Sequence, residues 1–253
     1  MYVLNIVIPM AGAGSRFALE GYVDPKPLIP IHGQPMIKVV IDNLRPKCAH
    51  RFIFVCQAVH VAAYGLKEKL SAWAEGCSII ELDGLTEGAA CTVLAAKALI
   101  NNDDELMIAN SDQYVDCDIN AYLAQMEVRG IDGLIMTMQS NDPKWSFVGL
   151  DDEGYATHVV EKEVISDEAT VGIYNFRHGQ DFVAAVESMI AENLRVNGEF
   201  YVAPAYNQLI SKGEKIGIYN IGFDGAGMHG LGIPSDLNAF LALPVSKHAC
   251  GVQ

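Results

Sequence analysis

The stretch that decides the fold is residues 6–36, IVIPMAGAGSRFALEGYVDPKPLIPIHGQPM. It begins with β-branched apolar residues, a pattern typical of a buried strand. The run gives way to Gly12 and Gly14, where the lack of a Cβ lets main-chain N–H groups approach an anion. Arg16 follows, and Lys26 stands between two prolines that stiffen the backbone. The stretch therefore predicts a strand followed by a phosphate-binding loop. The loop residues expected to bind nucleotide are Ala11, Gly12, Ala13, Gly14 and Ser15.

Two better-known phosphate loops do not fit this stretch. A Rossmann dinucleotide fingerprint requires a third glycine where this chain has Phe17, and an acidic residue after the second strand, where RFIFVCQ ends at Gln57. A Walker A loop ends in Gly-Lys-Ser/Thr, and no such triplet follows the glycines here. Both motifs are excluded on these residues.

A third pattern matches. The segment GAGSRF at residues 12–17, a short spacer and the segment PKPLIPIHGQPMI at residues 25–37 resemble the signature of nucleotidyltransferases that make NDP-sugars and related activated alcohols. IPMAGAGSRF, EGAACTVL, IANSDQY and VNGEFYV look closest to a bacterial subgroup of NDP-sugar pyrophosphorylases. The resemblance implies a Rossmann-like, GT-A-like nucleotidyltransferase fold that works with Mg²⁺.

Composition limits the class of protein and its partners. The chain has 253 residues, 51% hydrophobic and 19% charged, which is enough for one sizeable core. No apolar run approaches the about 20 residues of a membrane span, and the first residues lack the pattern of a signal peptide, so we expect a cytoplasmic protein. The net charge of −14 argues against nucleic acid and anionic membranes as partners. The six cysteines stand singly and are expected to be reduced, buried thiols.

Alternating apolar runs and helical patterns predict an α/β fold with a doubly wound, mostly parallel mixed sheet. No linker divides the chain, so we expect one domain over residues 1–253, with a nucleotide-binding half at about 1–140 and an acceptor-binding half at about 141–253. The ligand should lie beyond the carboxyl ends of the strands. The expected strands of the first half are 4–9, 51–56, 78–82, 105–109 and 132–138, and its helices are 35–45, 59–73, 89–101 and 119–129. The second half is expected to hold short strands in 145–176, a strand at 215–221, and helices near 179–193, 203–212 and 235–242.

Asp112 follows the strand expected at 105–109, where a carboxylate can hold Mg²⁺ together with phosphate oxygens and water. The resemblance implies the same role. It also implies a second metal carboxylate near the C-terminus, but that position is Gly230, so either Asp112 serves alone or Asp224 reaches in. The pair Asp116 and Asp118 has the spelling of a glycosyltransferase metal motif, but Asp118 is better explained as the N-cap of the next helix.

The resemblance also assigns the base and the acceptor. Gln57, Glu87 and Gly88 are expected beside the base, which is that of CTP, UTP or dTTP. Lys162 is expected to contact the acceptor phosphate. Gly172, Arg195 and Glu199 are expected beside the rest of the acceptor.

Together these residues indicate a Mg²⁺-dependent nucleotidyltransferase for surface polysaccharide synthesis, with Arg16, Lys26, Asp112 and Lys162 as its catalytic residues. The acceptor is a sugar 1-phosphate or a similar small phosphorylated molecule. The first alternative is a cytidylyltransferase for a non-sugar phosphate. Alternatives of another class are an NDP-sugar glycosyltransferase and a non-catalytic nucleotide-sensing homologue. Similar enzymes commonly form dimers or tetramers, so a homo-oligomer is compatible with the resemblance.

Overall fold

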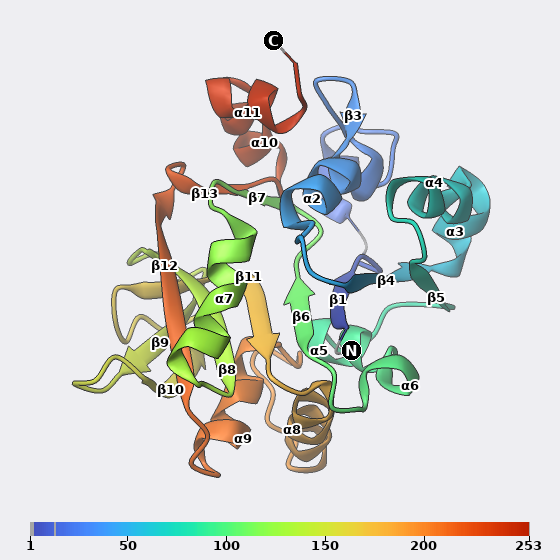
Figure 1. Cartoon of the computed structure of the whole chain (residues 1–253). Coiled ribbons are helices and arrows are strands. Elements are labelled where there is room, and N and C mark those ends of the chain that lie inside the picture. The colour runs from blue at the N-terminus through green and yellow to red at the C-terminus, as the bar shows by residue number, and fades with distance from the viewer. Residues whose placement is uncertain (1–2, 13, 253) are drawn as a thin grey trace.

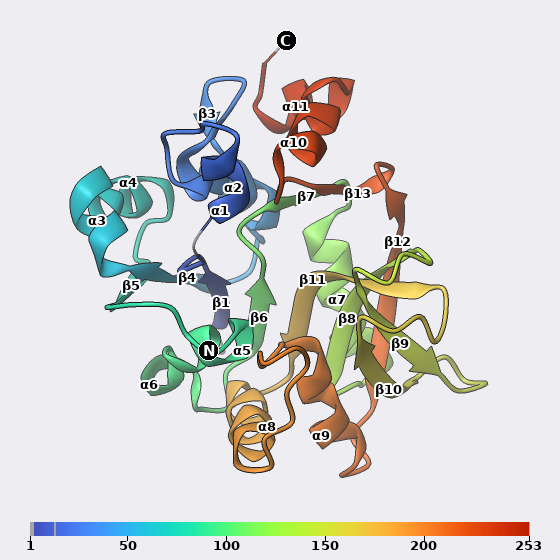
Figure 2. The same cartoon turned by 180° about the vertical axis from the view of Figure 1, so that it is seen from behind.

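A computed structural model describes residues 3–12 and 14–252, and helices cover both faces of its central sheet (Figures 1 and 2). None of the described helices has both the length and the apolarity needed to cross a membrane. The strands are β1 (Leu4–Pro9), β2 (Pro30–Ile31), β3 (Gln34–Pro35), β4 (His50–Gln57), β5 (Ser78–Leu82), β6 (Leu106–Ala109), β7 (Gln113–Val115), β8 (Gly133–Gln139), β9 (Ser146–Leu150), β10 (Ala156–Glu161), β11 (Glu168–Phe176), β12 (Ile216–Asp224) and β13 (Gly227–Gly230). The α-helices are α1 (Ser15–Leu19), α2 (Met36–Leu44), α3 (Ala58–Tyr64), α4 (Leu66–Trp73), α5 (Ala89–Leu94), α6 (Lys97–Ile100), α7 (Ile119–Arg129), α8 (Gly179–Ala191), α9 (Tyr206–Ile210), α10 (Pro234–Leu241) and α11 (Pro244–Ala249), and the 3-10 helices are η1 (Lys26–Leu28) and η2 (Ala203–Ala205).

The strands pair along the path β5-β4-β1-β6-β11-β8-β12-β13-β7. The strands β5, β4, β1 and β6 are parallel, β11 runs antiparallel between β6 and β8, and β12 is parallel to β8. The predicted doubly wound, mostly parallel mixed sheet is confirmed. Strands from both halves of the sequence interleave in this sheet, since β11 lies between β6 and β8, β12 pairs with β8, and β13 pairs with β7.

The first strand lies inside the sheet because apolar side chains point to both of its faces; the one buried polar residue, Asn5, accepts hydrogen bonds from Arg51. Ile6 and Ile8 pack into one buried cluster with residues of α2 and α7, and Val7 packs into another with residues of α5 and α8. Strands buried on both faces read as continuous apolar runs, which is the pattern found here. The loop that leaves β1 therefore begins at a fixed point, beside the carboxyl end of β6.

Two predicted helices are interrupted. The helix expected at 59–73 is broken at Gly65, whose φ of +57° is left-handed and ends α3 before α4 begins. The helix expected at 89–101 divides into α5 and α6. The short elements α1, β7, β13 and α11 were not predicted, because three to six residues are too few to display a period. The predicted N-cap is confirmed, since Asp118 accepts a hydrogen bond from the backbone N–H of Asn120 at 2.9 Å.

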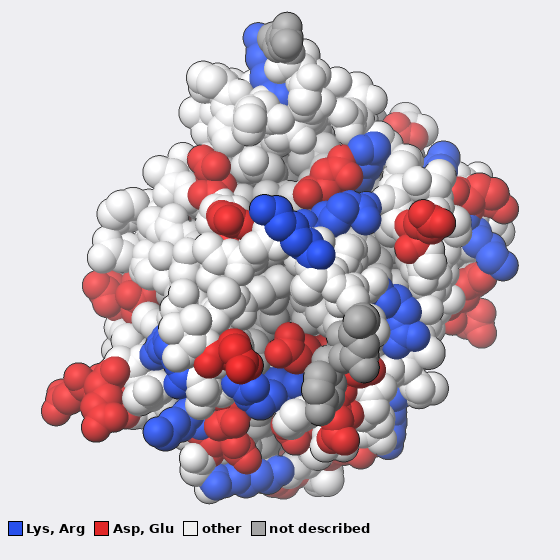
Figure 3. Space-filling view, viewed as in Figure 1, with Lys and Arg blue, Asp and Glu red and all other residues white. Residues whose placement is uncertain are grey.

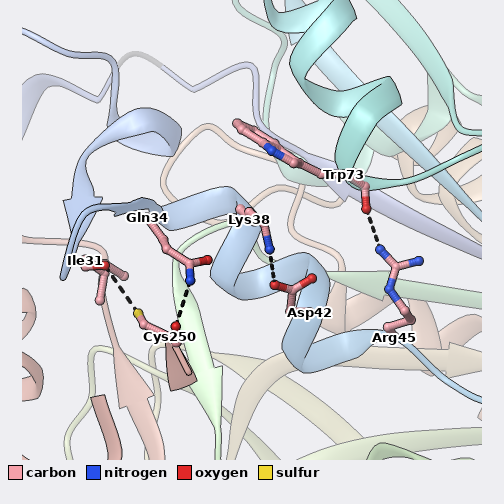
Figure 4. Close-up of polar contacts among 7 residues, drawn as sticks. All are labelled: Ile31, Gln34, Lys38, Asp42, Arg45, Trp73 and Cys250. Atoms are coloured by element: carbon pink, nitrogen blue, oxygen red, sulfur yellow. Dashed lines mark hydrogen bonds and ion pairs between the residues drawn. The ribbon is translucent and has the colours of Figure 1, made fainter. Parts of the chain in front are cut away.

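The C-terminal helices α10 and α11 brace the segment that carries Lys26. Phe17 and Ile29 pack with Leu237 and Phe240 in a third buried cluster. The Gln34 side-chain amide donates to the Cys250 carbonyl at 2.7 Å, and the Cys250 thiol lies 3.2 Å from the Ile31 carbonyl (Figure 4). The last helices thus hold residues 25–35, the proline-rich loop, in place.

All six cysteines carry free thiols, as predicted. Cys56 and Cys250 are buried, and burial raises the pKa of Cys56 to about 12. Cys48 is exposed, which corrects the expectation that these thiols are buried, because it lies in the turn between α2 and β4.

Candidate active site

A cavity of about 450 Å³ opens where the loops after β1 and β6 meet. This position agrees with the rule that doubly wound sheets bind ligands at the carboxyl ends of their strands. The predicted site residues that line the cavity are Ala11, Gly12, Lys26, Gly88, Asp112 and Glu199. Separate segments of the chain therefore converge on one space.

The polar centre of this cavity is an ion pair between Lys26 and Asp112. Nζ of Lys26 lies 2.7 Å from Oδ2 of Asp112, and each side chain is 24% exposed. Lys26 begins η1, and a Cβ at Gly14 would lie 3.5 Å from the Lys26 Cβ, so the glycine loop packs directly on the lysine. The main-chain carbonyl of Asp112 accepts from Leu231 N–H at 2.8 Å. The ion pair thus joins the proline-rich segment to the loop after β6.

Gly88 lets the second half of the chain reach the first cavity. Its φ is +126°, and a Cβ there would lie 2.5 Å from the Phe200 carbonyl oxygen. The backbones are joined by hydrogen bonds from Phe200 N to Glu87 O (2.8 Å) and from Ala90 N to Phe200 O (3.0 Å). Only glycine permits so close an approach, which brings Glu199 to the cavity wall.

A second cavity of about 230 Å³ adjoins the first, between β11 and the 3-10 helix η2. Its walls include the aromatic side chains of Trp145, Tyr174 and Tyr201 and the buried carboxyl of Glu161. Burial raises the pKa of Glu161, although a hydrogen bond from Ser146 opposes this shift. The cavity therefore offers aromatic surface, one acidic acceptor and the ammonium group of Lys144.

Two adjoining cavities, one lined by a glycine loop with a lysine, fit a reaction between a nucleotide and a second small molecule. A family model described as nucleotidyl transferase matches residues 6–200, well over half of the chain. The chain belongs to this family. The predicted resemblance is confirmed.

Individual relatives agree with the family. The chain is similar to a nucleoside-diphosphate-sugar pyrophosphorylase from Vibrio cholerae, with a TM-score of 0.80 and 28% identity over 94% of this chain and 100% of that one. It is similar in fold to an inositol-1-phosphate CTP transferase from T. maritima, with a TM-score of 0.73 and 14% identity over 100% and 99% of the two chains. It is 24% identical to the bifunctional protein GlmU of Methanococcus maripaludis over 96% of this chain and 56% of the relative. The chain spans about half the length of the curated relatives it matches.

Several residues that the family pattern assigns to the nucleotide do not line the larger cavity. The Gln57 side chain donates to the Ala11 carbonyl at 2.6 Å, so it supports the loop. Ser15 and Arg16 lie on α1, outside the described lining of both cavities, and Arg16 is exposed. Gly14 lines a smaller hollow behind the loop, and Ala13 lies outside the described residues.

The cations expected at the acceptor are already engaged. Lys162 has a left-handed φ of +59°, and its Nζ donates to the Tyr201 hydroxyl at 2.7 Å, which raises the pKa of the lysine. Arg195 pairs with Glu87 at 3.1 Å and lies 4.2 Å from the centre of the Phe200 ring. Arg195 therefore holds the loop between α8 and η2 in place, whereas Lys162 lies outside the lining of both cavities and contacts the second one only through Tyr201.

The expected second metal carboxylate has two candidates near Gly230. Asp224 is exposed and lies 3.6 Å from Nζ of Lys144. The second candidate is Asp236, whose carboxylate lies next to Gly230. A Cβ at position 230 would lie 3.3 Å from Oδ2 of Asp236. A Cβ at Gly232 would lie 2.7 Å from Oδ2 of Asp112. The glycines of this segment thus leave room for both Asp112 and Asp236.

Sequence reasoning missed Asn110, which lines both cavities, and Thr92, which lines the first. Neither is charged, and a search for cations and carboxylates passes over neutral side chains. The motif NSDQ that drew attention to Asp112 already contained Asn110. Its place at the carboxyl end of β6 was the available signal.

Gly172→Ala is expected to destabilise the protein by about 2–4 kcal/mol. The φ of Gly172 is +80°, and an added Cβ would lie 2.1 Å from Nδ2 of Asn110. Gly154→Ala is the matched control, because its φ of +79° is nearly the same but no atom lies within 4 Å of the added Cβ. Thermal unfolding should show a larger loss for Gly172→Ala. Equal losses would mean that backbone strain alone matters at position 172.

Glu161→Gln is expected to raise the unfolding temperature at pH 7–8 by about 2–4 °C, the shift that about 1 kcal/mol produces in a chain of this size. Burial raises the native pKa of Glu161 above its unfolded value. Ionisation of Glu161 therefore destabilises the folded state, and the stability is lost as the pH rises from the unfolded pKa to the native pKa. Below the unfolded pKa the wild-type carboxyl is neutral, as the amide of the variant is, and the advantage of the variant should vanish near about pH 4. A pH-independent difference would contradict this account.

Proposed function

We propose that the protein transfers a nucleoside monophosphate from an NTP to a phosphorylated small-molecule acceptor and releases pyrophosphate. The observation that carries this proposal is the Lys26–Asp112 pair, 2.7 Å apart, in a cavity that adjoins a second, smaller one. The NTP fits the larger cavity beside the glycine loop, and the acceptor fits the smaller. We place this reaction in the cytoplasm, as a step toward an NDP-linked precursor of surface polysaccharide.

The chemistry needs positioning more than covalent catalysis. An oxygen of the acceptor phosphate attacks the α-phosphorus in line, the bond to the β-phosphate breaks, and pyrophosphate leaves. The loop amides and Lys26 hold the β- and γ-phosphates. Arg16, on α1 outside the cavity lining, would turn toward these phosphates to join them, and Lys162 would leave the Tyr201 hydroxyl to hold the acceptor phosphate. The acceptor phosphate is ionised at neutral pH, so no general base is required.

The local charges matter because the chain as a whole is acidic, with a net charge of −14. On the face in Figure 3, Lys and Arg side chains lie beside Asp and Glu side chains. Distant carboxylates are screened beyond about 8 Å at physiological salt, so the charges at the cavity, above all that of Lys26, decide how phosphates bind. This arrangement suits a small anionic substrate and disfavours nucleic acid.

The donor set near Asp112 suits Mg²⁺. The described residues contain no cluster of three or more His, Cys, Asp or Glu side chains able to hold a metal. Mg²⁺ commonly takes one or two carboxylates and completes its octahedron with phosphate oxygens and water, so Asp112 with Asp236 would be sufficient. When bound, the ion would neutralise charge on the phosphates.

The acceptor is a sugar 1-phosphate or a similar molecule. Two similar structures indicate how widely the acceptor can vary: one is a nucleoside-diphosphate-sugar pyrophosphorylase, and the other is an inositol-1-phosphate CTP transferase. The second keeps a cytidylyltransferase for a non-sugar phosphate as the alternative.

The test is a screen for pyrophosphate release. The protein is incubated with Mg²⁺, each of CTP, UTP, dTTP and ATP, and a panel of hexose 1-phosphates, inositol phosphate and phosphocholine. We expect release with one NTP and one acceptor class, in equal amounts with the NDP-linked product. Calorimetric NTP binding without release would indicate a sensing homologue, and NDP-sugar cleavage without pyrophosphate would indicate a glycosyltransferase.

A further inference from the structure

The two cavities share a boundary, and that boundary is where the reaction must take place. This inference rests on the proposed function. The bond to be formed joins the α-phosphorus of a nucleotide in the larger cavity to an oxygen of an acceptor in the smaller one. Of the described residues, Ala89 and Asn110 line both cavities. Ala89 ends in a methyl group, so Asn110 has the hydrogen-bonding side chain at this junction.

The position of Asn110 is fixed by its backbone and by its neighbours. It directly follows β6, and its N–H donates to the Gly172 carbonyl at 3.0 Å. Its carboxamide lies over Gly172, where a Cβ would come within 2.1 Å of Nδ2. The pairing of β11 with β8 shifts register between Thr170 and Tyr174, which places the left-handed Gly172 in the bulge. The bulge makes the room that the carboxamide fills.

The chemistry of a carboxamide suits this place. It is neutral, so it does not repel the two phosphates that must approach each other, as a carboxylate would. Its NH₂ group donates hydrogen bonds, and phosphate oxygens accept them. Asn110 is also exposed, so its carboxamide can contact a ligand.

We propose that Asn110 is a further catalytic residue, which donates a hydrogen bond to an oxygen of the reacting phosphates as the new bond forms. The carboxamide neither gains nor loses a proton. The acceptor oxygen forms a bond to the α-phosphorus, and the bond from the α-phosphorus to the oxygen that bridges it to the β-phosphate breaks. The electron pair of the broken bond stays on that oxygen, which leaves with pyrophosphate. A fixed donor at the reacting group stabilises the charge that builds there in the transition state.

The experiment compares Asn110→Leu and Asn110→Ser with Asn101→Leu, a control at an exposed asparagine at the end of α6. We expect Asn110→Leu to lower kcat by about 10²-fold, as loss of one such donor does. The Kd for the NTP, measured by calorimetry, should stay within about twofold of wild type, because the donor acts mainly in the transition state. Asn110→Ser keeps a shorter donor and should lie between wild type and Asn110→Leu, and Asn101→Leu should match wild type.

The possible failures can be told apart. If wild type releases pyrophosphate and Asn110→Leu does so at a similar kcat, the role of Asn110 is wrong and the proposed function stands. If NTP affinity and kcat fall together in both Asn110 variants, with a lower unfolding temperature, Asn110 is a structural residue only. If wild type releases no pyrophosphate with any pair, both proposals fail.

Discussion

Asp112→Asn is expected to lower kcat for pyrophosphate release by about 10³-fold. A carboxylate that would hold the Mg²⁺ neutralising the reacting phosphates contributes several kcal/mol through that ion, and each ~1.4 kcal/mol is a factor of about ten in rate. Asp112 is the carboxylate in contact with Lys26 in the larger cavity, and the amide of the variant carries no charge to replace it. Steady-state kinetics would measure the loss of kcat. A Mn²⁺ titration in the presence of a non-hydrolysable NTP would measure the affinity for the metal.

The fold should survive this substitution. The side chains of Lys26 and Asp112 are each 24% exposed, and pairs with such access to solvent contribute about 1 kcal/mol or less. The bond from Leu231 reaches the main chain of Asp112 and does not depend on the side chain. The control is Asp42→Asn, which breaks the Lys38–Asp42 pair on α2 at a distance of 2.5 Å (Figure 4). A rate for Asp112→Asn within about tenfold of wild type would exclude a central role for this carboxylate.

The strands of the first half could be predicted because each is built around a short apolar run bounded by turn residues. The expected range 78–82 coincides with β5, and 105–109 differs from β6 by one residue. The sites of interruption were harder to predict. A glycine within an apolar helical pattern is often tolerated, and Gly65 interrupts this one because the chain there adopts a left-handed φ of +57°.

The sequence could predict which charged residues belong to the site, but not how each of them is oriented. Lys26 stands out in the sequence because it lies between two prolines after the glycine loop, and Asp112 stands out because it follows an apolar strand. Whether a cation faces the cavity depends on distant partners. Arg195 stacks on Phe200 and pairs with Glu87, a partner far earlier in the chain that local pattern cannot supply.

The close contacts between distant segments were beyond sequence reasoning. Gly88 meets Phe200, and Gly172 meets Asn110, each through the absence of a Cβ. A glycine in a sequence indicates freedom of the backbone, but it does not name the segment that approaches. These two contacts join segments that lie far apart in the sequence.

Lys26→Met is expected to lower kcat/KM for the NTP by about 10³-fold, because a cation fixed against the phosphates stabilises the charge of the leaving group. Lys38→Met is the control, since it removes the lysine of the α2 ion pair. The two charges of the cavity also depend on each other: without Lys26, the carboxylate of Asp112 faces the triphosphate alone and repels it. The effects of Lys26→Met and Asp112→Asn should therefore fail to add, and the double variant should be little slower than the slower single variant. Full additivity would mean that the 2.7 Å contact in the free protein has no counterpart in the reaction.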